Sequence, residues 1–267
     1  MTDLQWTVFC RFKDDFKAKV GEWSARIPNL RSLQQQISQA DKNPEYPFET
    51  PVVYNKSLDD IRPEDDIKLI VIGDNPGKEE QLARNNRYLV GQAGRLAEGY
   101  FRRNPELGVD FRRNVIILNK TPVHTAKTAQ LRALAKAGGS EVAALLEESQ
   151  IWCAQQTARL HTQLCRAVRQ ENQIEDDGVR PELWLVGYSE LKKNGIFERY
   201  RDTLRKSYEN DCGLSAEWES VFVFQHFSMN RFTIDLMDYI KKNDCGTASL
   251  QERIHSLGQI HKKEIFG

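Results

Sequence analysis

The sequence predicts an α/β protein of three layers, in which helices cover both faces of a roughly four-stranded parallel sheet. Four short runs of the chain are almost wholly apolar, and stretches with helical spacing of apolar residues separate them. Strands that are continuously apolar are buried on both faces, as in a parallel sheet enclosed by helices. A length of 267 residues, with 40% apolar and 28% charged residues, suits a globular chain of this kind.

The first predicted element is an amphipathic helix near the N-terminus. Large apolar residues recur there at steps of three and four, namely Phe9, Phe12, Phe16, Val20 and Trp23. This spacing places them on one helix face, which is typical of core packing. Residues 43–63 contain four prolines and indicate an extended connection. We therefore expect residues 1–66 to be a helical and extended segment packed on the main domain at 67–267, in one compact unit.

The predicted strands alternate with helices along the rest of the chain. The apolar runs are Lys68–Ile72, Asn114–Leu118, Leu183–Gly187 and Val221–Phe224. Helical stretches are expected near Gln92–Arg103, from about Ala129 to Gln170 with a break at Gly138-Gly139, at Phe232–Lys242, and around Leu250, Ile254 and Leu257. Strands that alternate with helices in this way form parallel sheets.

Composition excludes several classes of protein. No apolar run approaches the roughly 20 residues that span a bilayer, and the first residues are mixed and charged, unlike a secretory signal. The five cysteines are widely spaced and include no CxxC pair, which argues against a zinc ribbon and against a disulfide framework. We expect a cytoplasmic monomer that makes no membrane contact and needs no metal or other cofactor.

The charges are balanced overall but not along the chain. Lys plus Arg and Asp plus Glu both number 38, whereas the stretch Arg84–Arg132 holds ten basic residues against three acidic ones. This stretch predicts a basic face on a neutral protein, which would suit DNA. Charge alone favours the alternative interpretation, in which these residues lie on solvated faces of helices.

Ligands of open parallel sheets bind at the carboxyl ends of the strands, so the residues that follow each predicted strand are the candidates for chemistry. They are Gly73-Asp74-Asn75-Pro76-Gly77, Asn119-Lys120, Tyr188-Ser189, and His226 to Arg231. These segments offer amides, a histidine and cations, but no strong nucleophile and no cluster of metal ligands. The run GDNPGK is not a P-loop, because its second glycine comes too early and Glu79 replaces the Ser or Thr that binds Mg²⁺.

Four segments of the chain, in their order along it, resemble the uracil-DNA glycosylase superfamily over about residues 67–242. Gly73–Gly77 resembles the first catalytic motif of the mismatch-specific and single-strand-selective branches. Tyr88–Gly94 (YLVGQAG) resembles a stretch of the iron–sulfur branch, and Ile116–Asn119 resembles the strand that ends in the pyrimidine-reading Asn. His226-Phe227-Ser228 resembles the motif that opens the second catalytic loop. Each match alone is weak, and their common order makes the resemblance fairly specific.

The resemblance implies removal of uracil, or a related deaminated base, from DNA by hydrolysis of the N-glycosidic bond after base flipping. It assigns catalysis to Asn75, which would orient a water, and to His226, which would donate to the base O2. It implies substrate contacts from Gly73, Asp74, Pro76, Gly77, Tyr88, Leu89 and Asn119. It implies nucleic-acid contacts from Gly91, Lys120, Ser189, Ser228, Met229, Asn230 and Arg231.

Gly77 stands where the strictest uracil enzymes carry a tyrosine that blocks the thymine methyl. We therefore expect a base range wider than uracil, with the Gly77 amide available to the leaving base.

The chain also departs from the family. Cys10 stands alone and Thr121 replaces a cluster cysteine, so we expect no iron–sulfur cluster. Leu89 occupies the place of the base-stacking Phe, with Tyr88 as a substitute. The second loop lacks two prolines of the family motif.

Two alternatives to the enzyme stay open. One is a degenerate member of the fold that binds nucleic acid or a nucleotide without turnover, and the other is a nucleotide or small-molecule hydrolase. Taken singly, Asn75 is also a common turn residue, His226 could be a core histidine, and Asn119 could cap a turn.

Overall fold

A four-stranded parallel sheet lies at the centre of the computed structural model, which describes residues 1–42, 44–171, 179–210, 213–243 and 246–267. The strand order is β2-β1-β3-β6. The strands are β1 (Leu69–Gly73), β2 (Val115–Asn119), β3 (Glu182–Val186) and β6 (Val221–Phe224). Each lies within one residue of its predicted run, and the predicted fold class is confirmed.

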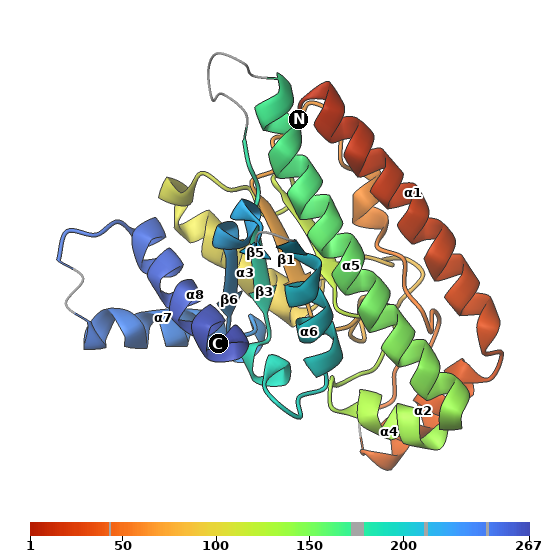
Figure 1. Cartoon of the computed structure of the whole chain (residues 1–267). Coiled ribbons are helices and arrows are strands. Elements are labelled where there is room, and N and C mark those ends of the chain that lie inside the picture. The colour runs from red at the N-terminus through yellow and green to blue at the C-terminus, as the bar shows by residue number, and fades with distance from the viewer. Residues whose placement is uncertain (43, 172–178, 211–212, 244–245) are drawn as a thin grey trace.

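Helices enclose the sheet on both faces (Figure 1). On one face lie α3 (Gln92–Arg103), α7 (Arg231–Lys242) and α8 (Leu250–Phe266). The indole of Trp184 in β3 contacts Phe101 of α3 and Phe232 of α7, with ring centroids 5.8 and 6.0 Å apart. The other face is covered by α5 (Gly139–Glu171) and α6 (Glu198–Ser207). The sheet residues are therefore buried on both sides, which is why their sequences are continuously apolar.

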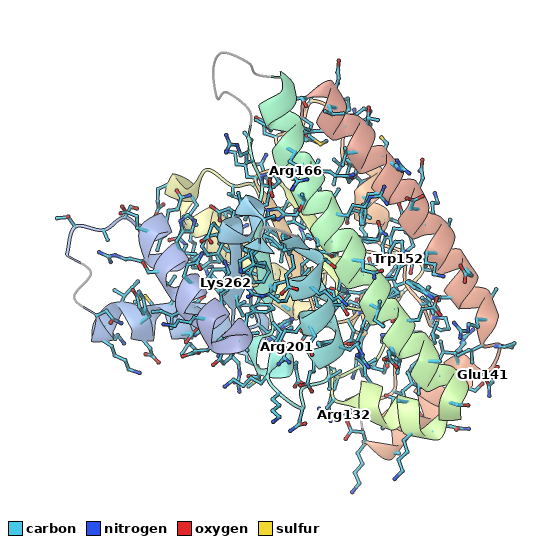
Figure 2. The ribbon with its side chains drawn as sticks, viewed as in Figure 1. Arg132, Glu141, Trp152, Arg166, Arg201 and Lys262 are labelled. Atoms are coloured by element: carbon cyan, nitrogen blue, oxygen red, sulfur yellow. The ribbon has the colours of Figure 1, made fainter. Side chains whose placement is uncertain are left out.

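The N-terminal helix α1 (Asp3–Arg26) packs along α5 (Figure 1). All five residues of its apolar stripe are buried, as the spacing predicts. Trp152 of α5 lies between the two helices (Figure 2), stacked on Phe16 at 5.8 Å and edge-on to Trp23 at 5.6 Å. One hydrophobic core joins α1 to the sheet. The helices α2 (Leu30–Ala40) and α4 (Gln130–Ala137) pack on each other.

The proline-containing connection crosses to the carboxyl end of β2. Val52 and Val123 form an isolated antiparallel bridge, and the amide of His124 donates to the carbonyl of Pro51 at 2.9 Å. Short elements that the sequence did not predict complete the fold. They are the hairpin of β4 (Glu209–Asn210) and β5 (Gly213–Leu214) and the 3₁₀ turns η1 (Lys56–Asp59), η2 (Pro105–Leu107), η3 (Tyr188–Leu191), η4 (Ala216–Ser220) and η5 (Ser228–Asn230).

Within the described part of the chain, none of the helices combines the length and the apolar character that a membrane crossing requires.

Candidate active site

A cavity of about 420 Å³ opens where the carboxyl ends of β1, β2 and β6 meet. Asn75 follows β1, Asn119 ends β2 and His226 follows β6, and all three line this cavity. Of the other predicted residues, Asp74, Gly77, Leu89, Gly91 and Ser228 also line it. Parallel strands bring their carboxyl ends to one edge, so Asn75 and His226, 151 positions apart in the chain, share one site.

The side chain of Asn75 is bound to the protein through its amide nitrogen. Nδ2 lies 2.9 Å from Oγ1 of Thr125 and also approaches the carbonyl oxygen of Val123 at 3.4 Å. No hydrogen bond from a described residue reaches Oδ1. The acceptor end of the amide is thereby left for a ligand or a water.

In Asn119 the amide nitrogen, a donor, is the atom without a hydrogen-bond partner among the described residues. The residue is 4% exposed. A buried donor without an acceptor costs about 1–3 kcal/mol. A Cβ on Gly73 would lie 2.5 Å from Oδ1 of Asn119, so only glycine fits beneath this side chain. Asn119 lines the cavity, and a bound carbonyl oxygen that reached this unpaired donor would satisfy it.

The imidazole of His226 is held in one tautomer. The backbone N–H of Ser228 donates to Nδ1 at 3.1 Å, and Oγ of Ser228 lies 2.7 Å from the same atom. Because Nδ1 accepts, the proton of the neutral ring must be on Nε2. Burial lowers the pKa of His226, and Lys120 lowers it further, while Asp74 acts in the opposite direction. The ring is therefore neutral at pH 7 and offers Nε2–H as a donor.

A buried ion pair lies beneath the site and corrects one prediction. Lys120 is fully buried, and its Nζ donates to Oδ1 of Asp74 at 2.6 Å and to the carbonyls of Gly73 and Val186. These acceptors at the ends of β1 and β3 take up the whole ammonium group. The prediction that Lys120 contacts nucleic acid is therefore wrong. Its role is to hold Asp74 in the wall of the cavity.

Tyr88 does not line the cavity either. Its ring is fully buried, and its hydroxyl donates to the carbonyl of Val53 at 2.6 Å. The prediction that it could stack on a base is wrong, because a core contact fixes the ring. Leu89 does line the cavity and has a left-handed backbone (φ 51°). A Cβ on Gly94 would lie 1.4 Å from the Leu89 carbonyl oxygen, so the glycine allows α3 to approach this turn.

The amide of Gly77 is already engaged, which corrects a second expectation. Its N–H donates to Oε2 of Glu80 at 2.9 Å, so it is not available to a leaving base. Burial raises the pKa of Glu80 to about 7, although backbone N–H groups of Gly77 and Leu89 and the charge of Arg112 oppose the shift. Glu80 lines the cavity, and no pattern in the sequence singles it out from the neighbouring Lys78 and Glu79.

The loop after β6 continues from Ser228 in the cavity wall to three exposed residues that do not line the cavity, Met229, Asn230 and Arg231. Met229 and Asn230 both have left-handed backbones (φ 54° and 57°), which is rare for residues other than glycine. The Met229 side chain is 71% exposed. Ser189 is exposed after β3 and does not line the cavity either, so the structure does not bring it to this site.

The described residues include no group of three or more His, Cys, Asp or Glu side chains that could hold a metal ion. Cys10 and Cys153 are free thiols, Sγ of Cys165 lies 3.7 Å from the carbonyl oxygen of Pro181, and Cys212 and Cys245 lie outside the residues that the structure describes.

No protein-family model matches the chain, and no curated protein matches it. The cavity offers an acceptor on Asn75, a donor on Asn119 and a donor on His226, beside charged side chains such as those of Lys78 and Glu80.

Proposed function

We propose that this chain removes uracil, or a related deaminated base, from DNA by hydrolysing the N-glycosidic bond. The supporting observation is the buried, unpaired Nδ2 of Asn119 in a cavity shared with Asn75 and His226. Deamination replaces an exocyclic amino group by a carbonyl oxygen, so a donor at this position favours the deaminated base over the normal one.

The three polar groups suit a reaction in which negative charge develops on the base. A base flipped into the cavity loses its bond to the sugar C1′, takes the bonding electrons and carries charge on its carbonyl oxygens. The Nε2–H of His226 is a preorganised donor for such an anion. A water held by Oδ1 of Asn75 adds to C1′, and its proton passes to the departing base. No nucleophilic side chain is needed.

The surroundings of the cavity support DNA as the polymer. Met229, which follows Ser228 of the cavity wall, presents an exposed apolar side chain, and apolar side chains of this kind enter the base stack and hold it open. Lys78 and Lys127 line the cavity and can contact phosphate. These features favour a nucleic-acid strand over a free nucleotide.

The direct test is incubation of the protein with single- and double-stranded oligonucleotides that carry uracil, hypoxanthine or xanthine. Abasic sites are detected as strand breaks after alkali. We expect breaks at one or more of the deaminated bases and none at cytosine or adenine. An Asn119→Leu variant, which keeps a similar volume but lacks the donor, should lose the preference for the deaminated base. Absence of abasic sites in every substrate would rule out the proposal.

A second candidate is a protein of this fold that binds nucleic acid without turnover. One observation favours it: among the described residues that line the cavity there is no Phe, Tyr or Trp to stack on a flipped base. Fluorescence anisotropy with the same oligonucleotides distinguishes the two candidates. Tight binding of uracil-containing DNA without abasic product would favour the second candidate.

A further inference from the structure

We infer that Thr125 is a positioning residue for Asn75, and that its hydroxyl fixes the Asn75 amide with Oδ1 facing the cavity. The effect of Thr125 on catalysis rests on the proposed function. The contact between Thr125 and Asn75 does not depend on that function.

The surroundings of the amide nitrogen contain acceptors alone. Nδ2 of Asn75 lies 2.9 Å from Oγ1 of Thr125, 3.3 Å from the carbonyl oxygen of Pro76, and 3.4 Å from those of Val123 and Thr125. If the amide were rotated by 180°, Oδ1 would face three carbonyl oxygens that have no proton to give. The chemistry of the neighbours therefore determines which end of the amide points outward.

The Thr125 hydroxyl can act only as an acceptor toward Asn75. Its Oγ1 donates to the carbonyl of Lys127 at 2.9 Å. With its single proton used there, the oxygen can only accept from Nδ2 of Asn75. Thr125 is only 4% exposed. At 2.9 Å, its hydroxyl is the closest hydrogen-bond partner of the amide nitrogen among the described residues.

His124, next to Thr125 in the chain, holds the backbone of the loop that follows Asn75. Nδ1 of His124 lies 2.8 Å from the carbonyl oxygen of Pro76, which can only accept, so Nδ1 carries the proton. Nε2 then accepts from the hydroxyl of Tyr46 at 3.0 Å. Burial lowers the pKa of His124 to about 4, which keeps this tautomer neutral near pH 7. The backbone N–H of Thr125 also donates to Pro76, at 3.3 Å. Two consecutive residues thereby hold both the loop and its side chain.

The orientation of the amide matters because of what a nucleophilic water requires. An acceptor binds one of the water's protons and leaves a lone pair free to attack the sugar C1′. An amide turned around would donate from Nδ2 to the water, which draws electron density from its oxygen and leaves its protons without an acceptor. The orientation set by Thr125 therefore makes the water the better nucleophile.

The test compares Thr125→Val with Thr125→Ser in steady-state kinetic assays on the best substrate of the wild-type protein. Valine keeps the shape and removes the hydroxyl, whereas serine keeps the hydroxyl. We expect Thr125→Val to lower kcat by about tenfold to a hundredfold with KM within about twofold, since misplacing a catalytic group has effects of that order. Thr125→Ser should recover most of the rate. Wild-type kcat in Thr125→Val would overturn the inference.

A second readout does not depend on activity. The side-chain NH₂ of Asn75 is assigned in a ¹⁵N correlation spectrum by its loss in Asn75→Ala, and its exchange with water is measured. We expect slow exchange in the wild type and in Thr125→Ser, and faster exchange in Thr125→Val. Equal exchange in all three would overturn the inference. If the wild-type protein released no base but the exchange pattern were as expected, the proposed function would fail and the positioning contact would stand.

Discussion

At the scale of single residues, the site works through the directions of a few hydrogen bonds. Asn75 offers an acceptor because its nitrogen is held, Asn119 offers a donor because its nitrogen is not, and His226 offers a donor because Ser228 occupies Nδ1. Two asparagines with the same chemistry thus take opposite roles according to their neighbours.

Asn75→Ala and His226→Ala should each slow base release by about a hundredfold to a thousandfold, since each removes a preorganised group from the developing charge or the water. Asn75→Asp should do no better than alanine, because a carboxylate would face the three carbonyl oxygens around Nδ2. Single-turnover rates check this, with Ser189→Ala as the control outside the cavity. Equal rates in all four proteins would mean that the chemistry lies elsewhere.

Glu80 should make the free energy of unfolding depend on pH. Its pKa is about 7 in the folded chain against 4.5 ordinarily, because burial disfavours the charge. As pH rises, the Glu80 carboxyl therefore ionises first in the unfolded chain. Its contribution to the free energy of unfolding is full below about pH 4.5 and is lost progressively as pH rises to about 7. The loss is about 3 kcal/mol at 1.36 kcal/mol per pKa unit. Urea unfolding at pH 5 and pH 8 should show this loss in the wild type and not in Glu80→Gln. Identical pH dependence would contradict it.

Gly77 should govern the range of bases. A Cβ there would meet nothing within 4 Å, so a larger side chain would enter open space in the cavity. We expect Gly77→Tyr to narrow the range of released bases while it keeps part of the uracil activity, since contacts of this size discriminate by about 1–3 kcal/mol. A panel of uracil, 5-substituted uracil and hypoxanthine substrates tests this. Strict uracil preference in the wild type would show that another residue limits the pocket.

At the scale of elements, the start of α3 sets the position of the turn at Leu89. Gly94→Ala should lower the free energy of unfolding by about 1–3 kcal/mol, because its Cβ would overlap the Leu89 carbonyl. The matched control is Gly21→Ala in α1, where nothing lies within 4 Å of the new Cβ. That substitution should stabilise the chain by about 0.5–1 kcal/mol through helix propensity. Urea titration of both variants measures the contrast, and equal effects would exclude the steric explanation.

At the scale of the whole molecule, the N-terminal segment and the sheet share one core. Trp23 is fully buried and packs edge-on against Trp152 of α5. Trp23→Ala should therefore cost about 3–5 kcal/mol and lower a single unfolding transition. Circular dichroism at 222 nm and the fluorescence of the remaining tryptophans should give coincident curves. Separate transitions would show that residues 1–66 fold as an independent unit.

The sequence by itself determined the fold class, the succession of the four sheet strands along the chain, and the edge at which Asn75, Asn119 and His226 meet. Each of these follows from local apolar patterns and from the geometry of parallel strands, which act over short stretches of chain. Strand boundaries were off by at most one residue, because a run of apolar residues shows where a strand lies but not where its pairing ends.

Only the tertiary structure decided how individual side chains are used. The sequence could not tell that Lys120 is buried on Asp74, that the Tyr88 ring belongs to the core, or that the Gly77 amide binds Glu80. Nor could it show that Thr125 orients Asn75 across 50 positions of chain. A hydrogen bond depends on distance and direction within a few tenths of an ångström, and these are set by packing between segments that no local pattern connects.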